Sequence, residues 1–289
     1  MLKFKTQPVG SIENLRGRVE RLVREPVEKL HKTNQLSLDL PYANNTVLID
    51  HPSKSIASFL DFVTDAIPDG DVYLFGGVLR DLAIFGRKGF NSDIDLVVEG
   101  DWTQFVSYLE SLNAFKNKFG GYRLTIGGWP VDIWNARETW AIKQGLVQYK
   151  GIASLTETTV LNWDAILMNW RTRNFIYREK YFEEITERIL DVVLEENPSP
   201  RGMAVRVFRH FYFKGAEKIT KRAAAYLSIC AKKYSFEEIK YAEVRSYSNT
   251  LIKPAVYKFF KNIDVSKDQD LEEQFIVVGN LIMKELDIH

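Results

Sequence analysis

The sequence that decides the fold is Leu74-Phe-Gly-Gly-Val-Leu-Arg-Asp81, followed twelve residues later by Asp93-Ile-Asp-Leu-Val-Val98. Alternate residues of a strand point to the same face of a sheet, so Asp93 and Asp95 would present two carboxylates side by side. Like charges this close cost free energy unless a cation lies between them, and carboxylate oxygens favour Mg²⁺ or Mn²⁺. The pair therefore predicts a metal site on an apolar strand.

The glycines before this strand predict a phosphate-binding turn. Gly76 and Gly77 let the backbone come close to a bound group, and a helix that starts near Val78 would point free N–H groups at it. Arg80 and Asp81 follow on that helix, where they either contact the sugar or phosphates of a nucleotide or form a local ion pair. A phosphate cradle beside metal-binding carboxylates is the equipment of nucleotidyl transfer.

The composition is that of an ordinary soluble protein. A chain of 289 residues, 45% hydrophobic and 27% charged, holds one large or two modest domains. The single cysteine, Cys230, excludes a disulfide framework and a cysteine-rich zinc site. The N-terminal residues lack the apolar core of a secretory signal, and no apolar run approaches the roughly 18 residues of a membrane span. The sequence thus predicts a cytoplasmic protein without a membrane partner.

The net charge of +1 conceals a basic C-terminal part. Between Arg201 and Lys261 there are fourteen lysines and arginines and four glutamates, a net charge of +10. This asymmetry predicts an acidic catalytic part and a basic part that binds a polyanion, and the alternative is a solvated helical face. The cations predicted to contact RNA phosphates are Lys221, Arg222, Lys232 and Lys233.

The spacing of apolar residues predicts alternating helices and strands up to about Glu196 and only helices after it. The predicted helices are 11–32 (with a kink or an end at Pro26), 53–67, 78–85, 102–112, 137–144, 159–171, 203–213, 219–233, 236–246, 253–260 and 271–286. The predicted strands are 72–75, 94–98, 122–126, 131–134, 175–177 and 192–194, with a hairpin at Gly127-Gly128-Trp129-Pro130. We therefore expect an N-terminal helical arm and connector (1–50), an α/β head (51–195) and a basic helical domain (196–289).

Four motifs, taken in order, resemble the head domain of class II CCA-adding enzymes and bacterial poly(A) polymerases, members of the polymerase-β nucleotidyltransferase superfamily. Gly76-Gly-Val-Leu-Arg-Asp81 with Asp93-Ile-Asp95 resembles the head signature. Val131-Asp-Ile-Trp-Asn-Ala-Arg137 resembles a later strand that carries an acidic residue and, five positions on, an arginine. Asn197-Pro198 and Ala204-Val-Arg-Val-Phe-Arg209 resemble the start of the helical neck. The resemblance covers residues 70–213 and implies an α+β fold: a mixed sheet with helices, then an all-α neck-like domain.

The resemblance also implies roles for particular residues. In this family the Gly-Gly turn contacts the triphosphate and the Asp-x-Asp pair holds two metal ions, which gives Asp93 and Asp95 two Mg²⁺, with Mn²⁺ as the other candidate. Asp132 would be the third metal-binding carboxylate and a general base, unless it is the solvent-facing position of an alternating strand. The implied nucleotide-binding residues are Gly76, Gly77, Arg80, Asp81, Arg137, Asp164, Asn197, Arg201, Arg206 and Arg209, of which the last three could equally form structural salt bridges.

The chain also departs from the family pattern. Asn162-Trp163-Asp164 keeps the aspartate of the family's Arg-Arg-Asp but neither arginine. Glu196-Asn-Pro-Ser-Pro-Arg201 replaces the aspartate of a base-reading Glu-Asp-x-x-Arg set with Asn197 and places the arginine one residue late. Asparagine both donates and accepts hydrogen bonds, whereas aspartate only accepts, so the family's choice of C and then A does not carry over. Residues 214–289 would replace the longer tRNA-holding body of the family.

These observations predict a template-independent, Mg²⁺-dependent nucleotidyltransferase. It would transfer a nucleotide from an NTP, ATP or CTP, to an RNA 3′ end, with tRNA as one candidate and DNA not expected. One alternative keeps the chemistry and changes the acceptor to a protein or small molecule, as in a toxin or defence factor. The other is a catalytically silent RNA-binding relative, which the intact carboxylate set disfavours.

Overall fold

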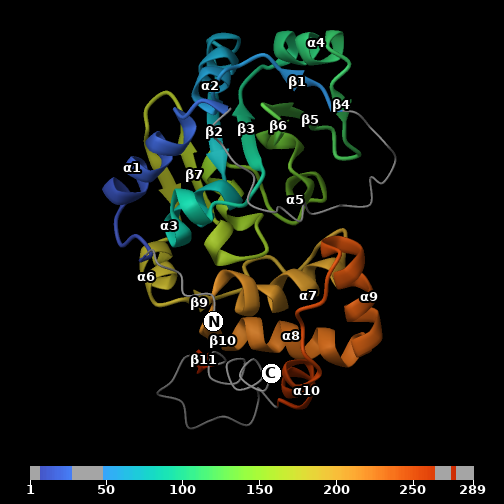
Figure 1. Ribbon diagram of the computed structural model, residues 1–289. Helices are drawn as coiled ribbons and strands as arrows, with labels where there is room; N and C mark the ends of the chain where they lie inside the picture. Colours follow the sequence, from blue (N-terminus) through green and yellow to red (C-terminus); the bar gives the residue numbers. More distant parts are fainter. Residues whose placement is uncertain (1–6, 28–47, 264–274, 278–289) are drawn as a thin grey trace.

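The computed structural model describes residues 7–27, 48–263 and 275–277. An eight-stranded mixed sheet forms the head, and a set of helices lies below it in Figure 1. The strands of the head are β1 (Asp50–His51), β2 (Asp71–Phe75), β3 (Ile94–Glu99), β4 (Phe115–Lys116), β5 (Tyr122–Ile126), β6 (Trp129–Asn135), β7 (Ile166–Asn169) and β8 (Phe175–Tyr177). Their order is β1-β5-β6-β3-β2-β7-β8, with β4 on β5. The α+β class that the sequence predicts is confirmed.

The helices surround this sheet and build the lower part of the molecule. They are α1 (Ile12–Val23), α2 (Ile56–Asp65), α3 (Gly77–Phe85), α4 (Thr103–Ser111), α5 (Trp140–Lys143), α6 (Tyr181–Thr186), α7 (Pro200–Arg209), α8 (Lys221–Lys233), α9 (Phe236–Tyr247) and α10 (Pro254–Asn262). Four 3₁₀ turns cover Arg87–Gly89, Ala136–Glu138, Ile152–Glu157 and Asn162–Asp164, and a π-helical turn covers His210–Lys214. A second, small sheet has the order β11 (Phe275–Val277), β10 (Lys218–Thr220), β9 (Ile189–Leu190).

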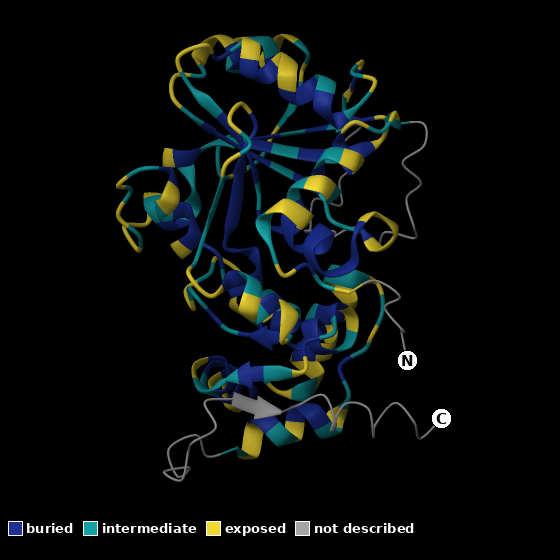
Figure 2. Cartoon of the chain, turned by 90° about the vertical axis from the view of Figure 1, so that its left-hand side faces the viewer, coloured by how far each residue is buried: buried dark blue, intermediate teal, exposed yellow. Residues whose placement is uncertain are grey.

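Strand alternation gives the large sheet two buried faces. Leu74, Leu96 and Ile133 belong to one core together with buried residues of α1, α2, α3 and α4. Tyr73 and Val97, which alternate with those positions, pack on the other face in a smaller core that includes Ala136, Ile152, Leu155 and Leu167. In Figure 2 the strands are buried at the centre while the surrounding helices expose their outer sides. The carboxylates of the Asp-x-Asp motif lie on the second face, because they alternate with Ile94 and Leu96.

A two-residue turn fixes the register of the β5–β6 hairpin. Gly127 and Gly128 have φ values of 56° and 72°, the left-handed region that a type I′ turn requires at both positions. Ile126 consequently pairs with Trp129, and the same register puts Arg123 opposite Asp132. The predicted hairpin is confirmed.

The segment predicted as a helix over 159–171 is instead the 3₁₀ turn at Asn162–Asp164 followed by β7. Strand β7 lies between β2 and β8, and its four residues are buried on both faces. A strand covered on both faces shows no polar alternation, so its apolar run has the same pattern as a buried helix. Pairing with β2 and β8, and not the local sequence pattern, therefore makes this segment a strand.

Other predicted elements differ in extent. The first helix ends at Val23, three residues before Pro26, where the sequence predicts a kink or an end, and residues 28–32 lie outside the described ranges. The segment predicted as helix 137–144 is divided between a 3₁₀ turn and α5, and the strand predicted at 192–194 is only an isolated bridge from Val192 to Leu161. Strand signals do not stop at Glu196, because β10 and β11 follow. Apart from Phe275–Val277, which forms β11, the predicted helix 271–286 lies outside the described residues.

Helix α1, which belongs to the predicted N-terminal arm, packs against the head. Its residues Leu15, Val19 and Leu22 are buried in the main core. Arg18 donates hydrogen bonds to the carbonyl oxygens of Leu82 (2.9 Å) and Ala83 (3.0 Å). These bonds attach α1 to the C-terminal end of α3.

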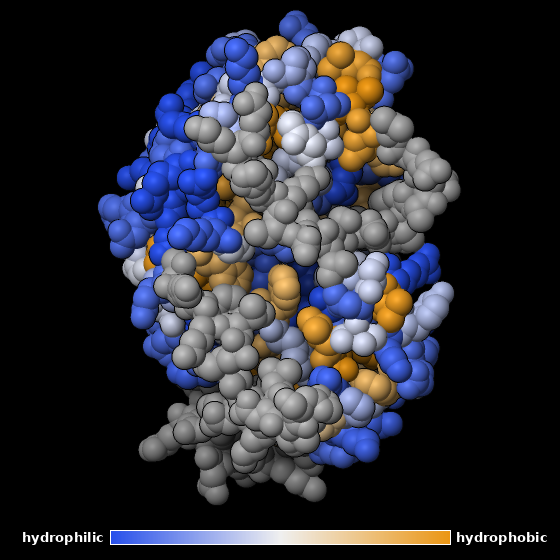
Figure 3. Space-filling model, viewed as in Figure 1, coloured by the Kyte–Doolittle hydropathy of each residue, from blue (hydrophilic) through white to orange (hydrophobic). Residues whose placement is uncertain are grey.

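None of the described helices combines the length and the apolar character that crossing a bilayer requires. On the face shown in Figure 3, hydrophilic residues cover the region of α1, and hydrophobic residues form separate small patches. No apolar band therefore runs across the described part of this face.

Candidate active site

Three carboxylates meet where two parallel strands lie side by side. Strand β3 pairs with β6 in a register that sets Asp95 beside Asp132, and Asp93 directly precedes β3. All three side chains are half-buried and line a cavity of about 680 Å³ between the head and the lower helices. The structure thus brings together the three aspartates that the sequence predicts as metal ligands.

An arginine lies among these carboxylates. Arg123, on β5, donates a hydrogen bond from Nη2 to Oδ2 of Asp93 at 2.5 Å, and its Nη1 is 3.6 Å from Oδ2 of Asp132. Asp95 forms no ion pair with any residue that the structure describes. The charge of the cluster is therefore only partly balanced by the protein.

The pKa values show the same imbalance. Burial, followed by the charges of Asp132 and Asp93, raises the pKa of Asp95 well above its ordinary value. Burial likewise raises the pKa of Asp132 to about 6, against the opposing effect of Arg123. A divalent cation would supply the missing positive charge, and three carboxylates suit Mg²⁺ or Mn²⁺.

As the side chains stand, no three His, Cys, Asp or Glu residues in the described ranges converge on a common metal position. The guanidinium of Arg123 bonds Asp93 and lies close to Asp132 at this point. Since the donor set fits a hard cation and the charge demands one, Asp93, Asp95 and Asp132 are the residues that would hold the metal.

The Gly-Gly turn at the start of α3 opens onto the same cavity. Gly76 has a φ of 61° and uses its N–H to bond the carbonyl oxygen of Ile166 at 3.0 Å. Of the two glycines of this turn, Gly77 lines the cavity, and a Cβ atom there would come within 3.3 Å of the Ser92 hydroxyl. The N-terminal end of α3 therefore faces the cavity and is suited to bind phosphate.

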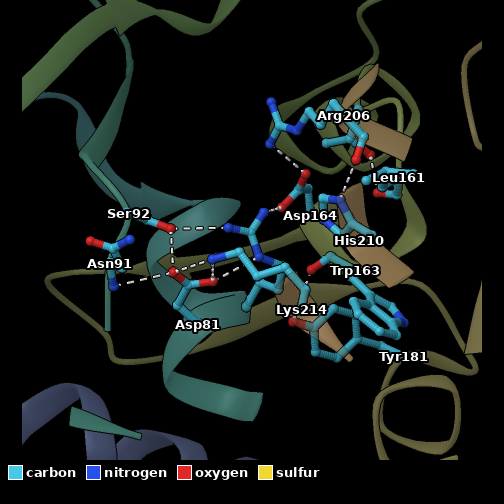
Figure 4. Close-up of polar contacts among 12 residues, drawn as sticks. Asp81, Asn91, Ser92, Leu161, Trp163, Asp164, Tyr181, Arg206, His210 and Lys214 are labelled. Carbon is cyan, nitrogen blue, oxygen red and sulfur yellow. Dashed lines mark hydrogen bonds and ion pairs between the residues drawn. The ribbon is translucent and has the colours of Figure 1, made fainter. Parts of the chain in front are cut away.

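A buried charge network lies behind this turn (Figure 4). Asp81 is fully buried and accepts hydrogen bonds from Lys214 Nζ at both carboxylate oxygens (2.8 Å each) and from Ser92 Oγ at 2.6 Å. The Nε of Arg80 is 2.9 Å from the same carboxylate. Despite its burial, Arg80 and Lys214 hold the pKa of Asp81 below its usual range. Asp81, predicted to contact nucleotide, does not line the cavity and instead positions Arg80 and Lys214, which do.

Asp164 forms the second half of this network. It is buried, pairs with Arg80, and accepts a hydrogen bond from Arg206 Nη2 at 2.9 Å. The two cations keep the pKa of Asp164 below its usual range despite its burial. Asp164 thus supports two cavity-lining arginines from behind without lining the cavity itself.

Helix α7 and the segment before it supply the opposite wall. Arg206 and Arg209, three residues apart, both line the cavity, as does Asn197. Arg209 pairs with the buried Glu243 at 2.6 Å, and its guanidinium lies 4.0 Å from the centre of the Tyr247 ring. The predicted arrangement of these two arginines on one helical face holds.

Two predicted nucleotide contacts lie elsewhere. Arg137 is stacked on the ring of Tyr149 at 4.6 Å, and Arg201 is exposed with Glu238 at 3.5 Å. Neither lines the cavity. Their roles in this structure are contacts with neighbouring side chains.

The four predicted RNA-binding cations occupy the two ends of α8. Lys221 and Arg222 begin this helix and Lys232 and Lys233 end it, which at 1.5 Å per residue separates the pairs by roughly 16 Å. Arg222, Lys232 and Lys233 are exposed, and Lys221 is half-buried. Together they would span several phosphates of a strand and could not clamp a single one.

Sequence reasoning missed several cavity-lining residues. The hairpin turn already contained the signal for Arg123, because a two-residue Gly-Gly loop sets this arginine directly opposite Asp132. No local pattern marks the others, which approach the cavity through tertiary packing: Ser92, His210, Lys214 and Tyr247.

No family model matches the sequence, and no curated protein matches it. Among solved structures, a CCA-adding enzyme in complex with CTP aligns with a TM-score of 0.49 and 20% identity, over 70% of this chain and 50% of that one. The Thermotoga maritima CCA-adding enzyme complexed with tRNA gives 0.46 and 20%, over 70% and 49%. A tRNA nucleotidyltransferase with a primer tRNA and an incoming ATP analog gives 0.45 and 16%, over 63% and 54%. This chain spans about half the length of these structures, which are of the class that the sequence motifs resemble.

Proposed function

We propose that this chain is a template-independent, divalent-metal-dependent nucleotidyltransferase that uses an NTP to extend the 3′ end of an RNA. One observation carries the proposal: the β3–β6 register sets Asp95 beside Asp132, with Asp93 next to them, in a cavity that also holds the N-terminal turn of α3. Metal-binding carboxylates and a phosphate-binding turn in one cavity are the two halves of nucleotidyl transfer.

The chain's own residues divide the work of the reaction. The triphosphate would lie against Gly77 and the cations Arg80, Lys214 and Arg206, which Asp81 and Asp164 hold in place. Divalent metal held by the three aspartates would polarise the α-phosphate and the attacking hydroxyl. The acceptor 3′-oxygen bonds to the α-phosphorus, the bond to the bridging oxygen breaks, and pyrophosphate leaves with that electron pair. Asp132 is the acceptor that we assign for the hydroxyl proton.

The experiment that tests this function is Asp95→Asn in a transfer assay with total RNA and each labelled NTP. We expect activity to fall roughly a thousandfold or more, because the charge that binds metal is removed. The melting temperature in metal-free buffer should stay equal or rise, because the substitution relieves repulsion from Asp93 and Asp132. Asp65→Asn, at an exposed position on α2, is the matched control. Unchanged transfer by Asp95→Asn would overturn the proposed function.

Base choice is a separate prediction. Asn197 lines the cavity where the related family places an aspartate, and Arg201 lies outside it. We therefore expect one preferred NTP, ATP or CTP, or relaxed choice, and no ordered addition of C, C and A. The measurement is incubation with a tRNA trimmed of its terminal C, C and A, with NTPs supplied singly and together. Faithful synthesis of all three nucleotides would contradict the prediction.

The acceptor has a competing assignment with the same chemistry. The cations at the two ends of α8 form no compact clamp for a single phosphate, and this leaves a protein or small-molecule acceptor as the alternative to RNA. Transfer of label to protein in a reaction without RNA would select that alternative. A silent RNA-binding relative would bind RNA and show no transfer with any NTP.

A further inference from the structure

Arg123 is the one cavity-lining arginine whose partners are the predicted metal ligands, among the residues that the structure describes. Its side chain, 17% exposed, bonds Asp93 at 2.5 Å and lies 3.6 Å from Asp132. The other arginines of the cavity have carboxylate partners of their own: Arg80 and Arg206 pair with Asp164, and Arg209 pairs with Glu243.

The position of Arg123 is fixed by backbone and not only by its side chain. The β5–β6 register sets its Cα opposite that of Asp132, and the β3–β6 register sets Asp132 beside Asp95. A guanidinium anchored there cannot move far from the carboxylates. It can, however, rotate toward the cavity that its side chain lines.

The carboxylates of Asp93 and Asp132 can bind either the Arg123 guanidinium or a metal ion, but not both through the same oxygens. With all three carboxylates ionised, as metal binding requires, the cluster and one guanidinium carry a charge of −2, which one divalent ion would balance. A metal ion that approaches Asp93 and Asp132 must displace a guanidinium that is hydrogen-bonded to Asp93 and ion-paired with Asp132, since both cations seek the same oxygens. An incoming triphosphate offers the guanidinium another anionic partner.

We propose that Arg123 is a positioning residue that couples nucleotide binding to metal binding. Without nucleotide it holds Asp93 and Asp132 and weakens their affinity for metal. The triphosphate then takes over the guanidinium, which frees both carboxylates for the divalent ion. By linkage, each ligand strengthens the binding of the other. This inference rests on the proposed function, because it uses the same carboxylates and the same nucleotide.

The test measures binding and not activity. Free Mn²⁺ is titrated into the full chain without nucleotide and followed by electron paramagnetic resonance, for the wild type, Arg123→Ala and Arg123→Lys. Removal of a cation a few ångströms from the metal should tighten Mn²⁺ binding by roughly tenfold or more, and lysine should give an intermediate value. In a second titration, in EDTA, the fluorescent nucleotide mant-ATP should bind Arg123→Ala more weakly than the wild type.

A matched control separates this role from a structural one. Arg178→Ala removes an arginine that pairs with Glu157 at 2.8 Å away from the cavity, and both titrations should equal those of the wild type. Circular dichroism and thermal melting of each variant report whether it folds. An arginine with a purely structural role would lower the melting temperature without a change in Mn²⁺ affinity.

The outcomes distinguish the inference from the proposed function. Tighter Mn²⁺ binding and weaker mant-ATP binding by Arg123→Ala would support the coupling. Equal Mn²⁺ affinity in Arg123→Ala and the wild type would overturn it and leave the metal site intact. Absence of Mn²⁺ binding in every variant would overturn both the inference and the metal-dependent function.

Discussion

Asp81 and Asp95 show how two aspartates of neighbouring motifs acquire different tasks. Asp81 has two cations within hydrogen-bonding distance, so its charge is balanced inside the protein. Asp95 has no ion-pair partner in the described ranges, and its pKa is raised by burial and by the adjacent carboxylates. A charge that the fold leaves unbalanced in a cavity is a reason to expect a bound cation.

His210 gives a prediction at the same scale. Its Nδ1 is 2.8 Å from the carbonyl oxygen of Arg206, which can only accept, so Nδ1 carries the hydrogen. The buried Nε2 has no partner in the structure. Burial, and then the charge of Arg80, lowers the pKa of His210 to about 3 from 6.5. The folded protein therefore keeps this ring neutral at pH values where the unfolded chain protonates it.

The sign of the resulting pH dependence follows from this difference. Below pH 6.5 the unfolded state binds a proton that the folded state does not, so acid lowers the free energy of unfolding until about pH 3. Urea titrations at pH 7 and pH 5 should show the wild type losing about 2 kcal/mol more than His210→Gln, which stays neutral. Parallel losses in the two proteins would show that His210 does not titrate differently on unfolding.

At the scale of elements, the sequence predicted what depends on local pattern. The i, i+2 spacing located Asp93 and Asp95, and the hairpin glycines located β5 and β6. The pattern failed at β7, whose residues Ile166–Asn169 are buried on both faces, and at β10, which has three residues. Both elements exist because other strands pair with them, and that information lies outside their own sequence.

The turn of the β5–β6 hairpin allows a prediction about the stability of Gly128 variants. Gly128 has a φ of 72°, and the space around its Cβ position is open, so a side chain there would be strained by the backbone and not by a neighbour. Gly128→Val should lower the free energy of unfolding by about 1–2 kcal/mol, whereas Gly128→Asn should cost less because asparagine tolerates this conformation. Urea unfolding compares them. Equal losses for the two variants would contradict a type I′ turn at this position.

At the scale of the whole molecule, the head and the helical part are joined by buried charge. Lys214, in the π-helical turn, reaches Asp81 on α3, and Arg206 on α7 reaches Asp164 of the head. Some cations of the basic C-terminal segment predicted from the sequence, such as Lys214 and Arg206, thus form ion pairs inside the molecule. Only composition was visible in the sequence, and composition does not separate buried cations from exposed ones.

The cations of α8 predict how RNA affinity depends on salt concentration. If the cations at the two ends of α8 hold phosphates, affinity should fall with salt by a slope of roughly −0.7 per contact on single-stranded RNA. Charge reversal of Lys221, Arg222, Lys232 and Lys233 should flatten that slope and weaken all sequences alike, since phosphates carry no base information. Gel-shift titrations at two salt concentrations measure both effects.

The control variant has the same change in net charge, but the reversed cations lie in the head and not on α8. Reversal of four exposed cations of the head, Lys143, Lys150, Arg171 and Lys180, should leave the salt slope as it is in the wild type. Weak RNA binding already in low salt, or equal slopes in both sets of variants, would assign the acceptor to the protein or small-molecule class.

The make-up of the cavity has a consequence for the order in which its walls form during translation. Its lining begins at Gly77 and ends at Tyr247, so its walls come from segments that lie far apart in the sequence. A chain emerging from the ribosome would display its three carboxylates once β6 had emerged, yet could not complete the cavity until α9 had emerged. Premature termination anywhere in that interval would release a product with the acidic strands and without the opposite wall, so the cavity is complete only after α9 has been synthesised.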